Sequence, residues 1–188
     1  YRWIKKLIKK VMKRILSLLA ALCCSIIVSS QSIHDLESNP SFKGITIGAP
    51  ISKYSDILAF SHTSHGKNVY RVIQSSYLSI FNIRMEDMIV VENGGKVYAI
   101  LLTKTYPSDS SGATVFNANE LLSWYSSLRS KYGNNSFSLD DMSGTPSVCG
   151  MRWEATSVVL DIVYLFYGTF GDENPKLQYS LYQREDDY

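Results

Sequence analysis

Apolar and polar residues alternate along much of the chain after residue 68, which predicts strands that bury one face. Clusters of Gly, Pro, Asn, Asp and Ser separate these runs and mark turns. The predicted strands are residues 69–74, 77–84, 88–92, 96–105, 151–156, 157–167 and 177–184, with a shorter one within 42–47. Asn93-Gly94-Gly95 predicts a tight hairpin between two of these runs, because the left-handed positions of such turns favour Asn and Gly.

Two segments show helical spacing instead. Leu121, Trp124 and Leu128 recur three to four residues apart up to Tyr132-Gly133, a typical helix stop. A shorter helix is predicted within residues 51–60, after a glycine-containing turn. The polar stretches between elements predict loops, and these are residues 61–68, 107–114 and 134–147.

The order of these elements predicts an α+β fold. We expect an antiparallel sheet with one short and one longer helix packed on one face. The order also fits two α-β-β type halves, although the halves share negligible sequence identity.

The N-terminal region has the pattern of an export signal. Residues 12–30 contain two basic residues, an apolar run of 14 residues and small residues before a predicted cleavage after Ser30. An uncleaved anchor is the alternative, but the run spans only about 21 Å as a helix, against a hydrocarbon core of roughly 30 Å. Residues 1–11 are interpreted as a non-native upstream extension, with a cationic amphipathic helix as the alternative. Residues 31–41 predict a flexible leader and residues 42–188 a single domain.

The net charge of the chain changes sign when residues 1–30, the upstream extension and the predicted signal segment, are left out. The chain has 19 Lys and Arg against 17 Asp and Glu, but seven of the basic residues and none of the acidic ones lie in residues 1–30. The remaining 158 residues therefore carry a net charge of −5. Nucleic acid is excluded as a partner because phosphate binding needs a concentrated basic surface. A membrane is expected to be contacted only through the signal segment.

The sequence contains few candidate catalytic residues. Cys149 lies between Val148 and Gly150 beside an apolar strand, so we interpret it as a buried small residue. The alternative is a secreted hydrolase that uses Cys149 with His62 or His65, supported by Asp140 or Asp141. The sequence shows no established nucleophile motif around Cys149.

Metal and cofactor sites are not indicated. His62 and His65 form an H-x-x-H pair without a nearby third ligand, which argues against zinc. Asp140-Asp141 and Asp172-Glu173 lack the ligand spacing of a calcium loop. We therefore expect neither a metal nor a cofactor.

Aromatic residues are the remaining feature, with 13 Tyr and three Trp. On strands such rings pack in the core or across strands, or form an exposed surface that binds protein or glycan. The candidate binding surface comprises Trp153, Tyr164, Tyr167, Tyr179 and Tyr182.

Short motifs give a resemblance to known families. Phe42 to Gly48 (FKGITIG), followed by a short helix, resembles the start of the envelope lipoproteins of outer-membrane assembly related to BamE. Lys131-Tyr132-Gly133, Trp153 and Tyr164 with Leu177-Gln178-Tyr179 also resemble such domains and the β-lactamase-inhibitor-protein fold. The resemblance implies non-catalytic protein binding through a sheet face and its loops. The chain departs from these families because it lacks a lipoprotein cysteine motif and paired disulfides.

Together these features predict an exported, non-catalytic binding module, located in the periplasm or outside the cell. Its partner is expected to be a protein or, alternatively, a glycan. The sequence specifies no oligomeric state.

Overall fold

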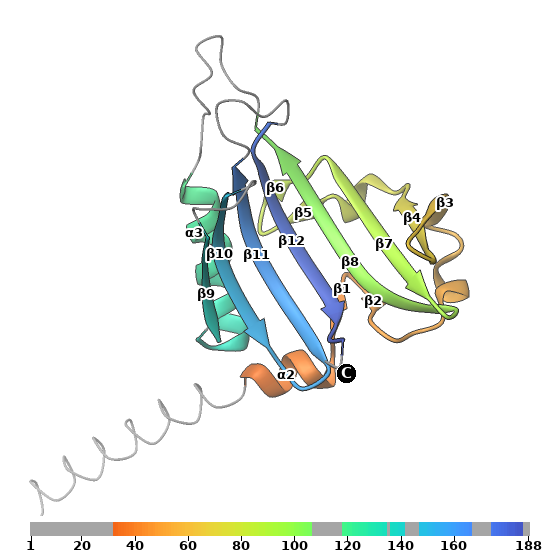
Figure 1. The fold of residues 1–188 in the computed structure, drawn as a ribbon, viewed down its shortest axis with the longest axis horizontal. Helices are drawn as coiled ribbons and strands as arrows, with labels where there is room; N and C mark the ends of the chain where they lie inside the picture. The colour runs from red at the N-terminus through yellow and green to blue at the C-terminus, as the bar shows by residue number, and fades with distance from the viewer. Residues whose placement is uncertain (1–31, 107–117, 135, 142–146, 167–173, 186–188) are drawn as a thin grey trace, which may run out of the picture.

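The chain is organised around one large antiparallel sheet (Figure 1). The computed structural model describes residues 32–106, 118–134, 136–141, 147–166 and 174–185. Within them the sheet has eight strands in the order β3-β4-β7-β8-β12-β11-β10-β9. Its strands are β3 (Leu58–Ser64), β4 (Lys67–Val72), β7 (Asp87–Asn93), β8 (Lys96–Thr105), β9 (Phe137–Asp141), β10 (Ser147–Glu154), β11 (Val158–Phe166) and β12 (Lys176–Gln183).

The sheet consists of two four-stranded parts. One contains β3, β4, β7 and β8, and the other contains β9 to β12. The last strand of each part, β8 and β12, pair with each other and make the sheet continuous. A helix precedes each part in the chain, α2 (Ser32–Ser38) in the first and α3 (Ala118–Tyr132) in the second.

The predicted hairpin at residues 93–95 is confirmed. β7 and β8 pair around Gly94 and Gly95, which have φ values of 59° and 81°. Such left-handed conformations are readily available to glycine. The carboxylate of Glu92 accepts a hydrogen bond from the Gly95 amide at 2.5 Å and fixes the turn.

The structure differs from the sequence-based expectation at several places. Residues 77–84, expected as one strand, contain the small hairpin of β5 (Ser79–Ile80) and β6 (Ile83–Arg84), and β9 lies within residues 134–147, where a loop was expected. Residues 32–38 form helix α2, where a flexible leader was expected, because Leu36 is fully buried in the core. Residues 58–64 form strand β3, where the end of a short helix and a polar loop were expected. The short helix is a single 3-10 turn, η1 (Ile51–Tyr54), and His65-Gly66 turns β3 back into β4.

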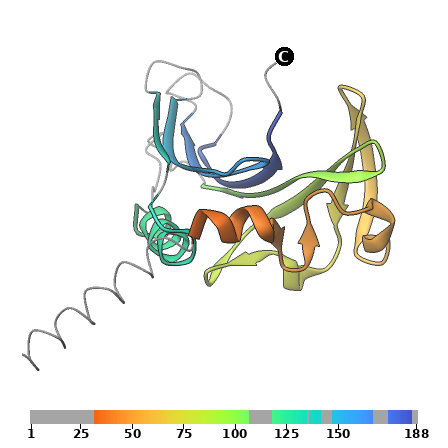
Figure 2. The ribbon, with the colours of Figure 1, turned by 90° about the horizontal axis from the view of Figure 1, so that it is seen from below.

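Two small hairpins complete the fold. β1 (Ser41–Phe42) pairs with β2 (Ile45–Thr46), and β5 (Ser79–Ile80) pairs with β6 (Ile83–Arg84). Figure 2 shows both hairpins on the side of the sheet where α2 and α3 lie. They place Phe42, Ile45 and Ile80 in the main core.

The core lies between α3 and the C-terminal strands. Trp124 of α3 packs edge-on against Tyr179 of β12, with ring centroids 6.3 Å apart. Tyr125 contacts Trp153 of β10, with centroids at 6.1 Å. The described residues thus show an α+β fold with an antiparallel sheet, and none of their helices combines the length and apolar content needed to cross a membrane.

Candidate functional site

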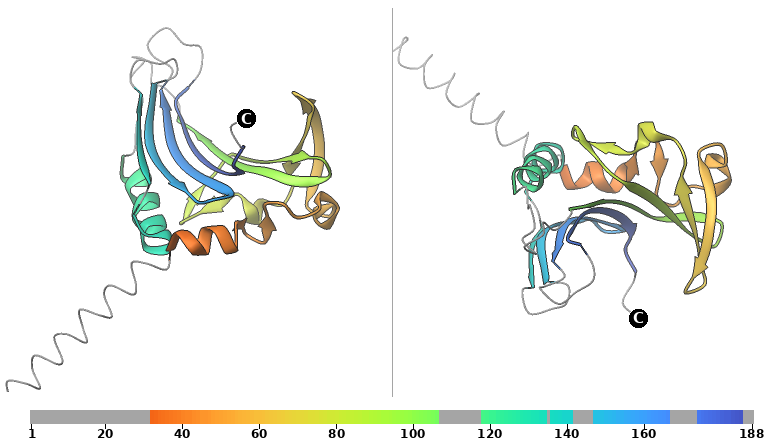
Figure 3. Two further views of the ribbon diagram at one scale, coloured as in Figure 1. Left: turned by 60° about the horizontal axis from the view of Figure 1, so that its bottom comes forward. Right: turned by 90° about the horizontal axis from the view of Figure 1, so that it is seen from above.

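The strongest candidate site lies on the side of the sheet opposite α2 and α3. Figures 2 and 3 show the sheet curved, with both ends bending away from these helices. We call this concave side the open face. Directly paired positions across the strands form its central row, which consists of Arg71, Ile89, Leu101, Ser180, Asp161, Arg152 and Phe137.

A hydrogen-bonded cluster occupies one end of this row. The guanidinium of Arg152 donates from Nε to Asp161 Oδ1 at 2.8 Å and from Nη2 to Oδ2 at 2.9 Å. The hydroxyl of Tyr182 donates to Asp161 Oδ2 at 3.0 Å and accepts from Arg152 Nη2 at 3.1 Å. Three neighbouring strands, β10, β11 and β12, therefore supply one closed network of side chains.

Two members of this cluster, Arg152 and Tyr182, have raised pKa values. Partial burial, and then the charge of Asp161 and its hydrogen bond, raise the pKa of Tyr182 to about 12. The hydrogen bonds that Arg152 donates to Asp161 raise the pKa of its guanidinium further above its ordinary value. Arg152 and Tyr182 therefore both favour their protonated forms within the cluster.

Apolar side chains surround the cluster. Val159 and Val163 of β11, Ala99 of β8 and Val69 of β4 are buried on this side, although they are not part of the main core cluster. No described helix or strand lies over them (Figure 2).

A second ion pair closes the other end of the central row. Arg71 Nη2 of β4 contacts Asp87 Oδ2 of β7 at 3.0 Å. Between the two charged ends, Ile89 and Leu101 are partly exposed. Ile89 and Leu101 therefore form an apolar centre between the two ion pairs, and the exposed ring of Phe137 ends the row beyond Arg152.

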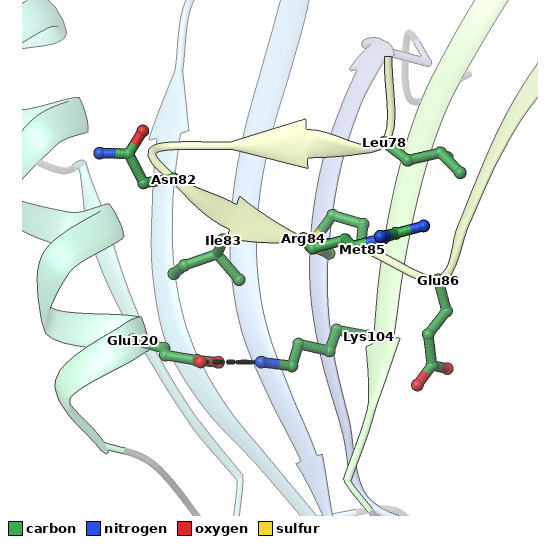
Figure 4. Close-up of a pocket in the computed structure, with 8 residues that line it drawn as sticks. All are labelled: Leu78, Asn82, Ile83, Arg84, Met85, Glu86, Lys104 and Glu120. Carbon is green, nitrogen blue, oxygen red and sulfur yellow. Dashed lines mark hydrogen bonds and ion pairs between the residues drawn. The ribbon is translucent and has the colours of Figure 1, made fainter. Parts of the chain in front are cut away.

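A hollow also lies on the opposite side of the sheet (Figure 4). It has a volume of 510 Å³ and lies between hairpin β5–β6, strand β8 and α3. Lys104 Nζ contacts the Glu120 oxygens at 2.7 and 2.8 Å, and the Tyr106 hydroxyl also donates to Glu120. The Glu120 carboxylate is thus already bound by Lys104 and Tyr106, which argues against a role for it as a catalytic base in this hollow.

The five predicted surface residues fall in different environments. Trp153, Tyr164 and Tyr179 are at most 3% exposed and pack in the core. Tyr167 lies outside the described residues. Tyr182 alone of the five is placed on the open face.

Sequence reasoning missed the two partners of Tyr182. Asp161 stands alone in the apolar run VVLDIVYL, and Arg152 stands between Met151 and Trp153. A lone charge in a strand that is otherwise apolar signals a buried ion pair, because an unpaired charge would be costly there. The lone charge was thus visible in the sequence. The strand pairing that brings Arg152 and Tyr182 to Asp161 was not.

The residues of the hydrolase alternative do not meet. Cys149 is on β10 and His62 is on β3, with five strands between them. Six strand spacings of about 4.8 Å amount to about 29 Å along the sheet. Cys149 and Tyr164 are also paired positions on the helix side of the sheet. His62 instead lies in the row of Val69 and Tyr182, on the open face.

The acidic pairs are not gathered into a metal site in the described part of the chain. No group of three His, Cys, Asp or Glu residues there is placed to hold a metal ion. Asp140 and Asp141 lie on the edge strand β9, and Asp172-Glu173 falls outside the described residues.

Comparison with protein-family models, curated proteins and solved structures finds no match to this chain. The resemblance to BamE-related lipoproteins and to the β-lactamase-inhibitor-protein fold therefore stays a prediction.

Proposed function

We propose that this chain is an exported, non-catalytic binding module that recognises a protein through the open face. In this proposal α2 and α3 back one face of the sheet and stiffen it. The opposite face is then left for a partner. The observation that carries the proposal is the Arg152–Asp161–Tyr182 cluster on a concave face that no described element covers.

The composition of this face supports a protein partner. Arg and Tyr are enriched among the residues that dominate protein–protein binding energies, especially where apolar neighbours exclude water. The cluster holds both residue types in fixed positions, so little side-chain entropy remains to be lost on binding. Ile89 and Leu101 add partly exposed apolar surface at the centre.

A glycan is less well supported as the partner. Sugar binding would favour a row of exposed rings, and three of the five candidate rings pack in the core. The open face instead combines aliphatic side chains and Arg152 with two separate rings, Tyr182 and Phe137, and both Arg and aromatic residues are enriched at protein interfaces.

Export is part of the same proposal. It is supported by the signal pattern of residues 12–30. The proposed location is the periplasm or the medium.

Site-specific cross-linking tests the proposal. A photoreactive amino acid replaces Thr103, a partly exposed open-face residue of β8, in the protein expressed in its native host. The matched control places the same group at Ser130, an exposed position on α3. We expect a protein adduct from position 103 and a much weaker one from position 130. Adducts from position 130 alone would overturn the assignment to the open face.

A further inference from the structure

Two tight hairpins face each other on the helix side of the sheet. The turn Lys43-Gly44 joins β1 to β2, and the turn Phe81-Asn82 joins β5 to β6. The Nζ of Lys43 donates to the Ser76 carbonyl at 2.5 Å and to Ser79 Oγ at 2.9 Å. These bonds hold the first hairpin against the segment that leads into the second.

The two hairpins and α3 enclose a hollow of 240 Å³. Its apolar wall includes Phe42, Phe81, Leu128 and the rings of Tyr132 and Tyr179. Drug-sized ligands occupy pockets of roughly 300–1,000 Å³, so this hollow suits a single ring with a short substituent.

The charged groups at this hollow have one sign. Lys43 and Lys131 line it, and no carboxylate does among the described residues. Partial burial lowers the pKa of Lys43, because no described anion offsets the loss of water around its ammonium group. Two of the three protons of that group are used by Ser76 and Ser79, which leaves one for a ligand.

The backbone at this hollow is strained. Phe81 and Lys43 each have a φ of 47°, a left-handed conformation that bulky residues rarely adopt. Asn or Gly would fit either position at lower cost. Such strain does not assign a role by itself, since His65 has a φ of 49° in another surface turn, so the position of the side chain decides. Here the ring of Phe81, 36% exposed, lines the hollow together with the two lysines.

We infer that this hollow binds a small aromatic carboxylate. The ring would lie between Phe81 and the wall formed by Leu128 and Tyr132, and its carboxylate would meet Lys43 and Lys131. This site lies on the face of the sheet opposite to the proposed protein-binding surface. It does not depend on that proposed function.

Titration with small probes tests the chemistry of the site. Phenylacetate carries both features, acetate carries only the charge, and phenethylamine carries the ring with the opposite charge. Binding is followed by chemical-shift changes on the purified protein. We expect saturable binding of phenylacetate in the millimolar range or tighter, and at least roughly tenfold weaker binding of the other two probes. Equal binding of all three probes, or no saturation by phenylacetate, overturns the inference.

Variants then separate binding from folding. Phe81→Asn removes the ring and relieves the left-handed strain, so we expect a higher melting temperature together with roughly tenfold weaker phenylacetate binding. The matched control is His65→Asn, because His65 has a φ of 49° in the turn between β3 and β4 and does not line the hollow. It should raise the melting temperature and leave binding unchanged.

The charge requirement has its own pair of variants. Lys131→Gln is expected to weaken phenylacetate binding several-fold, since it removes one of the two cations. Lys53→Gln removes an exposed lysine on η1 that does not line the hollow, and it should have no effect. Unchanged binding in both Phe81→Asn and Lys131→Gln would show that the probe binds elsewhere, and the inference would be wrong.

Discussion

Gly150 sets how closely β10 approaches β11. A Cβ atom added at this position would lie 2.1 Å from the carbonyl oxygen of Ile162 and 2.8 Å from the Cα of Val163. Both are backbone atoms, so a side-chain rotation cannot relieve the contact. Glycine inside a strand often marks such a close approach.

Gly150→Ala should therefore destabilise the fold. We expect a loss of roughly 1–3 kcal/mol or more in the free energy of unfolding, because the strands must separate to accept the methyl group. Chemical denaturation measures this loss, with Ser138→Ala on the neighbouring strand β9 as an exposed control. A loss no larger than that of the control would show that β10 and β11 are not as close as described.

Tyr182 gives the open-face cluster a distinct alkaline response. Its pKa is raised from an ordinary value of about 10 to about 12. A raised pKa means that the folded state favours the protonated phenol. The resulting stabilisation is complete below pH about 10 and is lost as the pH rises towards about 12.

We expect the unfolding free energy to fall between these pH values, and to fall less in Tyr182→Phe. Tyr182→Phe retains the ring and removes the ionisable hydroxyl that bonds to Asp161. Denaturation curves at several alkaline pH values provide the comparison. Identical pH dependence in the two proteins would contradict the hydrogen-bonded environment of this phenol.

At the scale of elements, α3 is fastened to the sheet at its C-terminal end. The indole Nε1 of Trp153 on β10 donates to the Gly133 carbonyl at 3.0 Å, just past the last turn of the helix. Trp124, in the middle of α3, is also fully buried, but its Nε1 has no hydrogen-bond partner among the described residues. The two tryptophans thus differ in one hydrogen bond.

Trp153→Phe and Trp124→Phe isolate the contribution of that bond. Both substitutions remove a similar volume, so both should destabilise the protein. The loss should be larger for Trp153→Phe by about 1 kcal/mol, the usual net contribution of one hydrogen bond. Equal losses in thermal or chemical denaturation would indicate that the bond to Gly133 adds nothing to the attachment of α3.

The elements that sequence could predict were those with strong local signals. The helical spacing of Leu121, Trp124 and Leu128 and the glycine hairpin at residues 93–95 lie inside elements of the expected type. Strand β3 was missed because five of its seven residues are exposed, which removes the apolar alternation on which the prediction relied. α2 was missed because a seven-residue helix is held by the burial of Leu36 and by contacts with α3, which local sequence does not reveal.

At the scale of the whole molecule, the pairing of β8 with β12 creates the open face. Tyr182 meets Ala99 across this pair, and Ser180 meets Leu101. These strands are about 80 residues apart in the sequence, so no local pattern could show that they are neighbours. The aromatic excess pointed to strands of the second part, but only the register shows that Tyr182 faces away from the core.

The affinity of a partner most directly tests the proposal that the open face binds a protein. The protein recovered by cross-linking from position 103 is titrated against the unmodified chain, Tyr182→Ala and Leu122→Ala. Leu122 is 53% exposed on α3 and serves as the matched apolar truncation on the opposite side. We expect Tyr182→Ala to weaken binding by about 2 kcal/mol, roughly thirtyfold, and Leu122→Ala to leave it unchanged. Full affinity in Tyr182→Ala combined with a loss of affinity in Leu122→Ala would contradict binding at the open face and place the interface on the helix side.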